Sequence, residues 1–153
     1  MEPRSLVVGI GSTLLGLDGF GPAVIARLQA RTDLPGGTVL LDANTDLLGC
    51  LDRFAAFQQV IVVDAFVGGS GNADVAVVAE SEISNWGVES PDSHAVSGVL
   101  AIGLFRRLYP AAAATTIWLV GLNAAGVALG DVIADGTIDA GVEAVIRLIA
   151  DRC

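Results

Sequence analysis

The most constraining stretch of the sequence is an apolar strand that leads into a glycine-rich loop and then into a helix. The strand is predicted at residues 6–10, the loop begins at Gly11, and the helix begins at about Pro22, a residue suited to the first helical turn. A strand, a glycine-rich turn and a helix form the first half of a β-α-β unit. Open sheets built from such units bind ligands at the carboxyl ends of their strands, so this loop is a candidate functional site.

Apolar runs alternate with helical patterns along the rest of the chain. Further strands are predicted at residues 38–41, 60–63, 73–79 and 116–120, and further helices at residues 47–57, 94–108 and 137–152. The β-branched run at residues 60–63 is typical of a strand buried on both faces. The strand at 73–79 follows a glycine-rich turn and is a candidate antiparallel hairpin partner, whereas residues 80–93 are expected to be irregular. Thr137 is the expected cap of the last helix.

This alternation predicts the fold class. Strands that alternate with helices indicate a mainly parallel sheet covered on both faces. We therefore expect residues 1–153 to form a single three-layer α/β domain, with a twisted sheet of about five strands between helices.

Composition excludes several classes of function. The chain is 53% hydrophobic and 16% charged, enough for a sizeable core, yet no apolar run reaches the roughly 18–20 residues that span a bilayer. Its net charge of -9 would repel nucleic acid and favours cations or a basic protein segment. Every basic residue is an arginine, which excludes a lysine-dependent phosphate loop, and the single histidine, His94, excludes a two-histidine zinc motif.

The N-terminal residues and the cysteines indicate the compartment. The first residues lead straight into a strand and do not read as a signal peptide, so we expect a cytoplasmic protein without membrane insertion. The two cysteines, Cys50 and Cys153, lie far apart in the sequence, so a disulfide framework is not expected. Cys50 is most simply a small buried residue.

Three side chains are candidates for a shared site. Asp18 lies in the glycine-rich loop, Asp64 ends the β-branched strand, and His94 begins a predicted helix. A parallel sheet would bring all three to the carboxyl ends of its strands. Two carboxylates and one imidazole suit zinc, nickel, manganese or iron and leave room for water or substrate. Each also has a structural interpretation: Asp18 as a turn former, Asp64 as a loop cap and His94 as a helix-terminus residue.

A nucleotide-binding interpretation also stays open. Gly9 and Gly11 match the first two glycines of a dinucleotide-binding fingerprint, but Leu14 stands in place of the third. Asp42, which follows the second predicted strand, could contact a ribose.

The sequence resembles the hydrogenase maturation proteases, the endopeptidases that trim the large-subunit precursor of nickel–iron hydrogenases. The resemblance covers nearly the whole chain and rests on LVVGIGSTLL at residues 6–15, DGFG at 18–21, VVDA at 62–65, SH at 93–94 and LVG at 119–121. It implies a twisted sheet between helices, and it implies that the metal-contacting residues of the family fall on Asp18, Asp64 and His94.

The resemblance also implies a substrate and a reaction. Family members recognise nickel already installed in the precursor and then release a short C-terminal peptide. The nickel would belong to the precursor, and other divalent metals could occupy the site in vitro. Asp18, Asp64 and His94 would act in catalysis through this metal, which either activates water or polarises the scissile carbonyl. The loop at residues 42–46 would help to admit substrate, with Asp42 and Thr45 as the binding candidates.

Three departures from the family pattern keep a second function open. Leu17 stands where an acidic residue commonly precedes the metal-contacting aspartate, Ala43-Asn44 replaces a usual glycine pair, and Ser12 replaces a usual asparagine. None of them removes a ligand. They predict a divergent member with altered substrate preference or lost activity. The alternative is therefore a nonhydrolytic metal- or precursor-binding maturation factor on the same fold.

Overall fold

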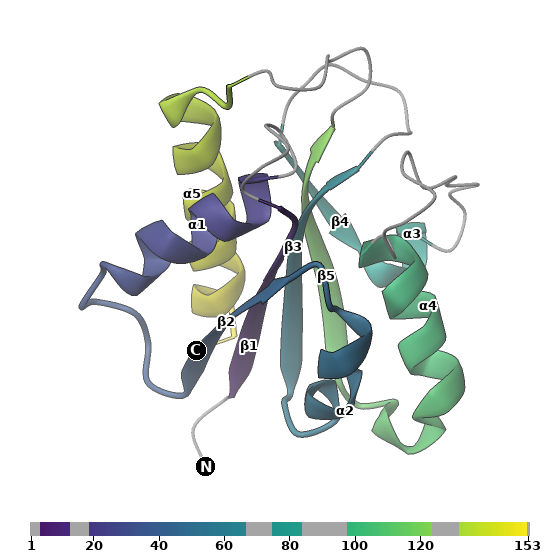
Figure 1. Ribbon diagram of the computed structural model, residues 1–153. Helices are drawn as coiled ribbons and strands as arrows, with labels where there is room; N and C mark the ends of the chain where they lie inside the picture. The colour runs from purple at the N-terminus through teal and green to yellow at the C-terminus, as the bar shows by residue number, and fades with distance from the viewer. Residues whose placement is uncertain (1–3, 13–18, 67–74, 84–97, 124–131, 153) are drawn as a thin grey trace.

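A single five-stranded sheet forms the centre of the protein, as a computed structural model that describes residues 4–12, 19–66, 75–83, 98–123 and 132–152 shows (Figure 1). The strands are β1 (Ser5–Ile10), β2 (Thr38–Asn44), β3 (Gln59–Phe66), β4 (Val75–Ala79) and β5 (Thr116–Asn123), in the order β2-β1-β3-β5-β4. All neighbouring strands pair in parallel except β4, which runs antiparallel to β5. The predicted sheet and its antiparallel strand are confirmed, but the expected hairpin is wrong, because β4 pairs with β5 and not with the preceding strand β3.

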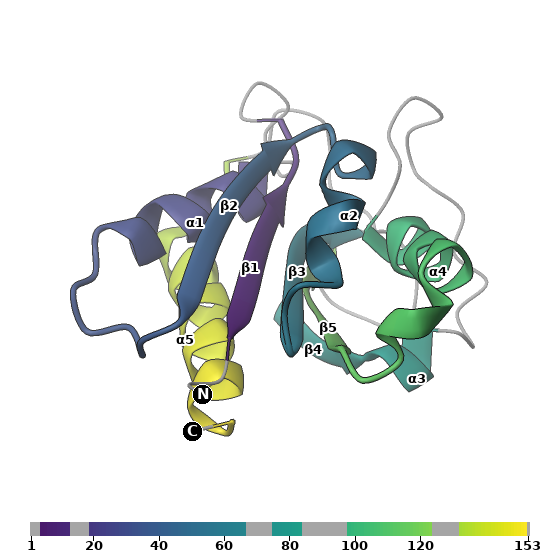
Figure 2. The same ribbon diagram turned by 90° about the horizontal axis from the view of Figure 1, so that it is seen from below.

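Helices cover both faces of the sheet (Figure 2). One face carries α1 (Phe20–Gln29) and α5 (Asp135–Ala150), and the other carries α2 (Leu51–Phe54), α3 (Glu80–Ile83) and α4 (Gly98–Leu108). Two 3₁₀ turns, η2 (Leu48–Cys50) and η3 (Pro110–Ala112), precede α2 and β5. Within the described ranges, no helix is long and apolar enough to cross a membrane.

The central strand β3 joins the two halves of the core. Ile61 and Val63 pack among the side chains of α1 and α5, whereas Val60 and Val62 pack on the side of α2 and α4. All four side chains are fully buried, as their β-branched run predicts. Each buried side chain of this size contributes roughly 1.5–3 kcal/mol relative to exposure. The residues that follow in β3 are thereby held on a rigid part of the molecule.

Three strands are longer than their apolar runs predict. β2 continues to Asn44, β3 to Phe66 and β5 to Asn123. The last two are extended together, because the backbone ladder between β3 and β5 reaches the pair Phe66 and Asn123. Asp64 therefore lies inside β3, two residues before its end. Asp42 likewise lies inside β2.

Two helices differ from the prediction made for residues 47–57 and 137–152. The first is only η2 followed by the four-residue α2, and the Asp46 carboxylate accepts the Gly49 N–H at 2.9 Å at its start, as a helix-capping residue does. The last helix begins at Asp135 rather than Thr137, and no side chain caps it. Asp135 is held by Arg27 of α1, whose Nη2 donates to Asp135 Oδ1 at 2.6 Å.

Two smaller expectations were also wrong. The segment at residues 80–93 begins with the helical turn α3, which an ion pair between Glu80 and Arg106 holds against α4. Cys50 is half-buried rather than buried, and its Sγ lies 3.4 Å from the Asp46 carbonyl oxygen.

Candidate active site

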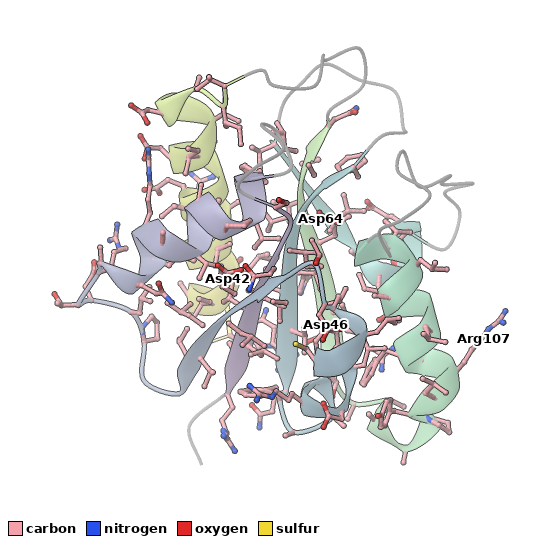
Figure 3. All side chains as sticks on the ribbon, viewed as in Figure 1. Asp42, Asp46, Asp64 and Arg107 are labelled. Carbon is pink, nitrogen blue, oxygen red and sulfur yellow. The ribbon has the colours of Figure 1, made fainter. Side chains whose placement is uncertain are left out.

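Asp64 occupies the carboxyl end of the central strand (Figure 3). Its side chain points to the face of the sheet covered by α4, and the residue is only 5% exposed. A buried carboxylate needs hydrogen-bond donors to offset its lost hydration. The backbone N–H of Gly98, the first residue of α4, donates to Asp64 Oδ2 at 2.9 Å. The partial positive charge at the start of this 11-residue helix also favours the ionised carboxylate.

The described end of the loop that carries Asp18 also reaches β3. Asp18 itself lies outside the described residues, but Gly21 in α1 packs directly on the sheet. A Cβ added to Gly21 would lie 2.6 Å from the carbonyl oxygen of Val63, the residue before Asp64. Asp18 lies three positions before Gly21 in the sequence.

His94 also lies outside the described residues, four residues before Gly98. Gly98 contacts Asp64 directly. The described part of the chain holds no group of three or more histidine, cysteine, aspartate or glutamate side chains that could bind a metal. The convergence of Asp18, Asp64 and His94 therefore stays a prediction, compatible with the described ends of both loops.

Asp42 and Thr45 lie at the carboxyl end of β2, on the edge of the sheet. Both are exposed, and Asp42 Oδ1 accepts the backbone N–H of Asn44 at 3.0 Å. Asp42 and Val63 both pair with Gly9, so Asp42 points to the α1 face, opposite to the Asp64 carboxylate. Asp42 and Asp64 thus share one end of the sheet but not one face.

Backbone geometry joins the end of β2 to the start of the glycine-rich loop. The Gly11 N–H donates to the Asn44 carbonyl oxygen at 2.7 Å. Gly11 has a φ of 135°, which side-chain-bearing residues rarely adopt, and Asn44 has a φ of 52°. The predicted substrate-binding loop and the loop that carries Asp18 therefore start from one hydrogen-bonded corner.

A groove of about 550 Å³ lies elsewhere, between β4 and α5. Its walls include Val75, Val77, Ala144 and Leu148, with Arg147 at the rim. It opens on the face covered by α1 and α5, away from the Asp64 carboxylate. It is therefore not part of the candidate active site.

Gly98 is the site residue that the sequence pattern missed. The predicted helix at 94–108 placed Gly98 inside a helix, where a glycine destabilises by roughly 0.5–1 kcal/mol relative to alanine. That unfavourable glycine was the available signal. A hydrogen bond from its backbone to a carboxylate 34 residues away leaves no other mark in the sequence.

Proteins from hydrogenase maturation are similar to this chain in sequence. No protein-family model matches the chain. The hydrogenase expression/formation protein HupM of Azotobacter chroococcum mcd 1 is 29% identical over 112 residues, and HoxM of Azotobacter vinelandii is 28% identical over 111 residues. Each match covers 71% of this chain and 54% of the relative. The chain thus spans about half the length of these curated relatives.

Solved structures of hydrogenase maturation proteases resemble the whole chain. The hydrogenase maturating endopeptidase HybD from E. coli superposes with a TM-score of 0.76 at 22% identity, covering 97% of this chain and 93% of HybD. The [NiFe] hydrogenase maturation protease HycI from Thermococcus kodakarensis KOD1 gives 0.67 at 20% identity, covering 97% and 90%. At these identities the likeness establishes the fold. The chain has the fold of the hydrogenase maturation proteases, and the resemblance that its sequence indicates is confirmed at that level.

Proposed function

We propose that this protein is a cytoplasmic endopeptidase that removes a short C-terminal peptide from the nickel-loaded precursor of a nickel–iron hydrogenase large subunit. The observation that carries the proposal is the position of Asp64. It is a buried carboxylate on the central strand, next to the described ends of the two loops that hold Asp18 and His94. The fold of the solved maturation proteases and the similarity to hydrogenase expression/formation proteins support it.

Asp18, Asp64 and His94 are proposed to contact the nickel that the precursor carries. One imidazole and two carboxylates suit a borderline divalent metal. Three protein ligands leave coordination positions for groups of the precursor, which is compatible with a nickel that the precursor carries. Such a metal can polarise the scissile carbonyl or activate water. The Gly98 N–H favours the ionised form of Asp64, which is the form that binds a metal.

Asp42 and Thr45 are proposed to contact the precursor outside the metal site. Both are exposed at the end of β2, which supports a role in binding. Because Asp42 points to the face opposite to Asp64, it would bind a part of the precursor that passes over the edge of the sheet.

The test is to incubate the purified protein with nickel-loaded precursor and, in parallel, with nickel-free precursor. Mass spectrometry should show a shortened large subunit only in the nickel-loaded sample. His94→Ala should stay folded but fail to trim, because imidazole is the strongest of the three ligands and the chain has no second histidine. Asp18→Glu should lose less activity, since it keeps an oxygen ligand.

Each outcome separates the candidate functions. Nickel-dependent binding of the precursor without shortening would favour the nonhydrolytic maturation factor. Trimming by His94→Ala at the wild-type rate would overturn the role of His94. Unfolding of His94→Ala would support its structural interpretation as a helix-terminus residue.

A further inference from the structure

We propose that Gly98 is a positioning residue for Asp64. Its N–H orients the carboxylate, and its lack of a side chain leaves the carboxylate room to stay in place. This inference rests on the proposed function, in which Asp64 contacts the nickel of the precursor.

The hydrogen bond from Gly98 restricts the orientation of the Asp64 carboxylate. The terminal torsion of an aspartate side chain has broad, roughly two-fold preferences, so rotamers alone do not fix the carboxylate plane. The Gly98 N–H donates to Asp64 Oδ2 at 2.9 Å, and both residues are buried. Hydrogen bonds to ionised acceptors are about twice as strong as neutral ones. The Gly98 N–H is therefore one of the contacts that set the direction of the Asp64 oxygens.

The space around Gly98 explains why this residue has no side chain. An added Cβ would lie 3.0 Å from Val62 Cγ1 and 3.2 Å from Asp64 Oδ2. Both separations are tighter than ordinary van der Waals contact, so a neighbour would have to move by a few tenths of an ångström. Val62 is fully buried in the core and has little room to move. The displacement would therefore fall on the Asp64 carboxylate or on α4 itself.

Two substitutions at position 98 distinguish the effect of losing the hydrogen bond from the effect of adding a side chain. Gly98→Ala keeps the N–H and adds the Cβ. Gly98→Pro adds the ring and also removes the donor, at the first helical position, where proline is well tolerated. Gly103→Ala is the matched control, because it lies on the same helix and its Cβ would have no atom within 4 Å.

The variants should lower turnover of nickel-loaded precursor and leave the association with nickel-free precursor unchanged. With nickel-loaded precursor, kcat should fall roughly tenfold in Gly98→Ala and about 100-fold in Gly98→Pro, a loss typical of a displaced catalytic group. KM for nickel-loaded precursor should rise, because Asp64 contacts the nickel, and Gly103→Ala should match the wild type in both constants. Wild-type kcat in a folded Gly98→Pro protein would overturn the proposal.

A double variant distinguishes positioning from packing. Val62→Ala removes the Cγ1 atom that an alanine at position 98 would contact, but it leaves the contact with Asp64. If Gly98 positions Asp64, kcat stays low when Val62→Ala is added to Gly98→Ala. Full recovery of kcat would show that the loss came from packing and would overturn the proposal.

A second readout does not depend on cleavage. In NMR spectra of the wild type, the Gly98 amide proton should resonate downfield because it is bonded to a carboxylate. It should move upfield in Asp64→Ala and less in Asp64→Asn, which keeps an oxygen acceptor. An unchanged resonance in Asp64→Ala would overturn the inference. Absence of cleavage by the wild-type protein would instead count against the proposed function, and the NMR result would still test the contact.

Discussion

Two glycines on opposite faces of β3 allow helices to approach the strand that carries Asp64. Gly21 brings α1 against the backbone of Ile10 and Val63, and Gly98 brings α4 against the Asp64 carboxylate. Both glycines lie in the first turn of their helix. The position of each helix start relative to Asp64 therefore depends on residues that have no side chain.

Replacing Gly21 with alanine should destabilise the protein by about 3 kcal/mol or more. The new Cβ would lie 2.3 Å from the Ile10 carbonyl oxygen and 2.6 Å from that of Val63, and the backbone of buried strands cannot yield to it without loss of packing. Gly136→Ala in α5 is the control, since its Cβ would meet open space and should stabilise by up to about 1 kcal/mol. Urea unfolding curves measure both changes, and equal midpoints for the two variants would contradict this account.

At the scale of elements, Arg106 links α4 to two other parts of the chain. Its Nε and Nη2 donate to the two carboxylate oxygens of Glu80 in α3, at 2.6 and 2.7 Å. Its guanidinium also donates to the carbonyl oxygens of Ala112 and Thr115, which precede β5. The hydrogen bond to Glu80 raises the pKa of Arg106. One planar side chain therefore holds α4 against α3 and against the turn before β5.

Replacing Arg106 with lysine should lower the free energy of unfolding by about 1–3 kcal/mol. Lysine keeps the charge but cannot form the two-pronged bond to Glu80 while it also bonds the carbonyls. Arg107→Lys is the matched control: the neighbouring side chain points into solvent, and its substitution should stay within about 0.5 kcal/mol (Figure 3). Thermal unfolding of both variants checks the difference. If Arg107→Lys lowered the free energy of unfolding as much as Arg106→Lys, the specific role of the two-pronged bond to Glu80 would be refuted.

Side-chain patterns predicted which elements form, but not where they end. The β-branched run at 60–63 correctly indicated a central strand, because hydrophobic periodicity reports burial. The ends depend on contacts between distant residues. Pairing with Asn123 extends β3 to Phe66, and the bond from Arg27 to Asp135 lies at the start of α5. Neither contact leaves a local pattern in the sequence.

The candidate site, too, was predictable from the sequence only in part. The position of Asp64 was predictable, because a carboxylate directly after a buried apolar run lies at the carboxyl end of that strand, whereas its role in the site stays a prediction. Its hydrogen bond from Gly98 was not, since a backbone donor looks the same at every position. The roles of Asp18 and His94 stay predictions, because both residues lie outside the described part of the chain.

At the scale of the whole molecule, ion pairs from an arginine join helices on both faces of the sheet. Arg27 of α1 forms ion pairs with Asp135 and Asp139 of α5, which join the two helices on one face. The other face contains the Asp64 carboxylate and the start of α4. The net charge of -9 makes the surroundings of this site favourable to a cation. The nickel of a precursor would be attracted, but attraction alone does not hold a metal in place.

The isolated protein should therefore not retain stoichiometric nickel after dialysis against a chelator. The chain offers one imidazole and two carboxylates to the proposed site, and burial raises the pKa of the Cys50 thiol, which disfavours a thiolate ligand there. The remaining ligands should come from the precursor, so nickel should appear only in the complex of the two proteins. Elemental analysis of the protein alone and of that complex measures this directly. One nickel per chain in the dialysed protein would instead indicate a resident metal.

Measuring the association of the two proteins can show whether Asp64 provides its dependence on nickel. Asp64→Asn should weaken the association with nickel-loaded precursor and leave the association with nickel-free precursor unchanged, because only the metal contact is weakened. Asp33→Asn removes the same negative charge from an exposed ion pair with Arg31 and should change neither association. Equal losses in both variants would show that net charge, rather than a ligand at the end of β3, drives recognition of the nickel-loaded partner.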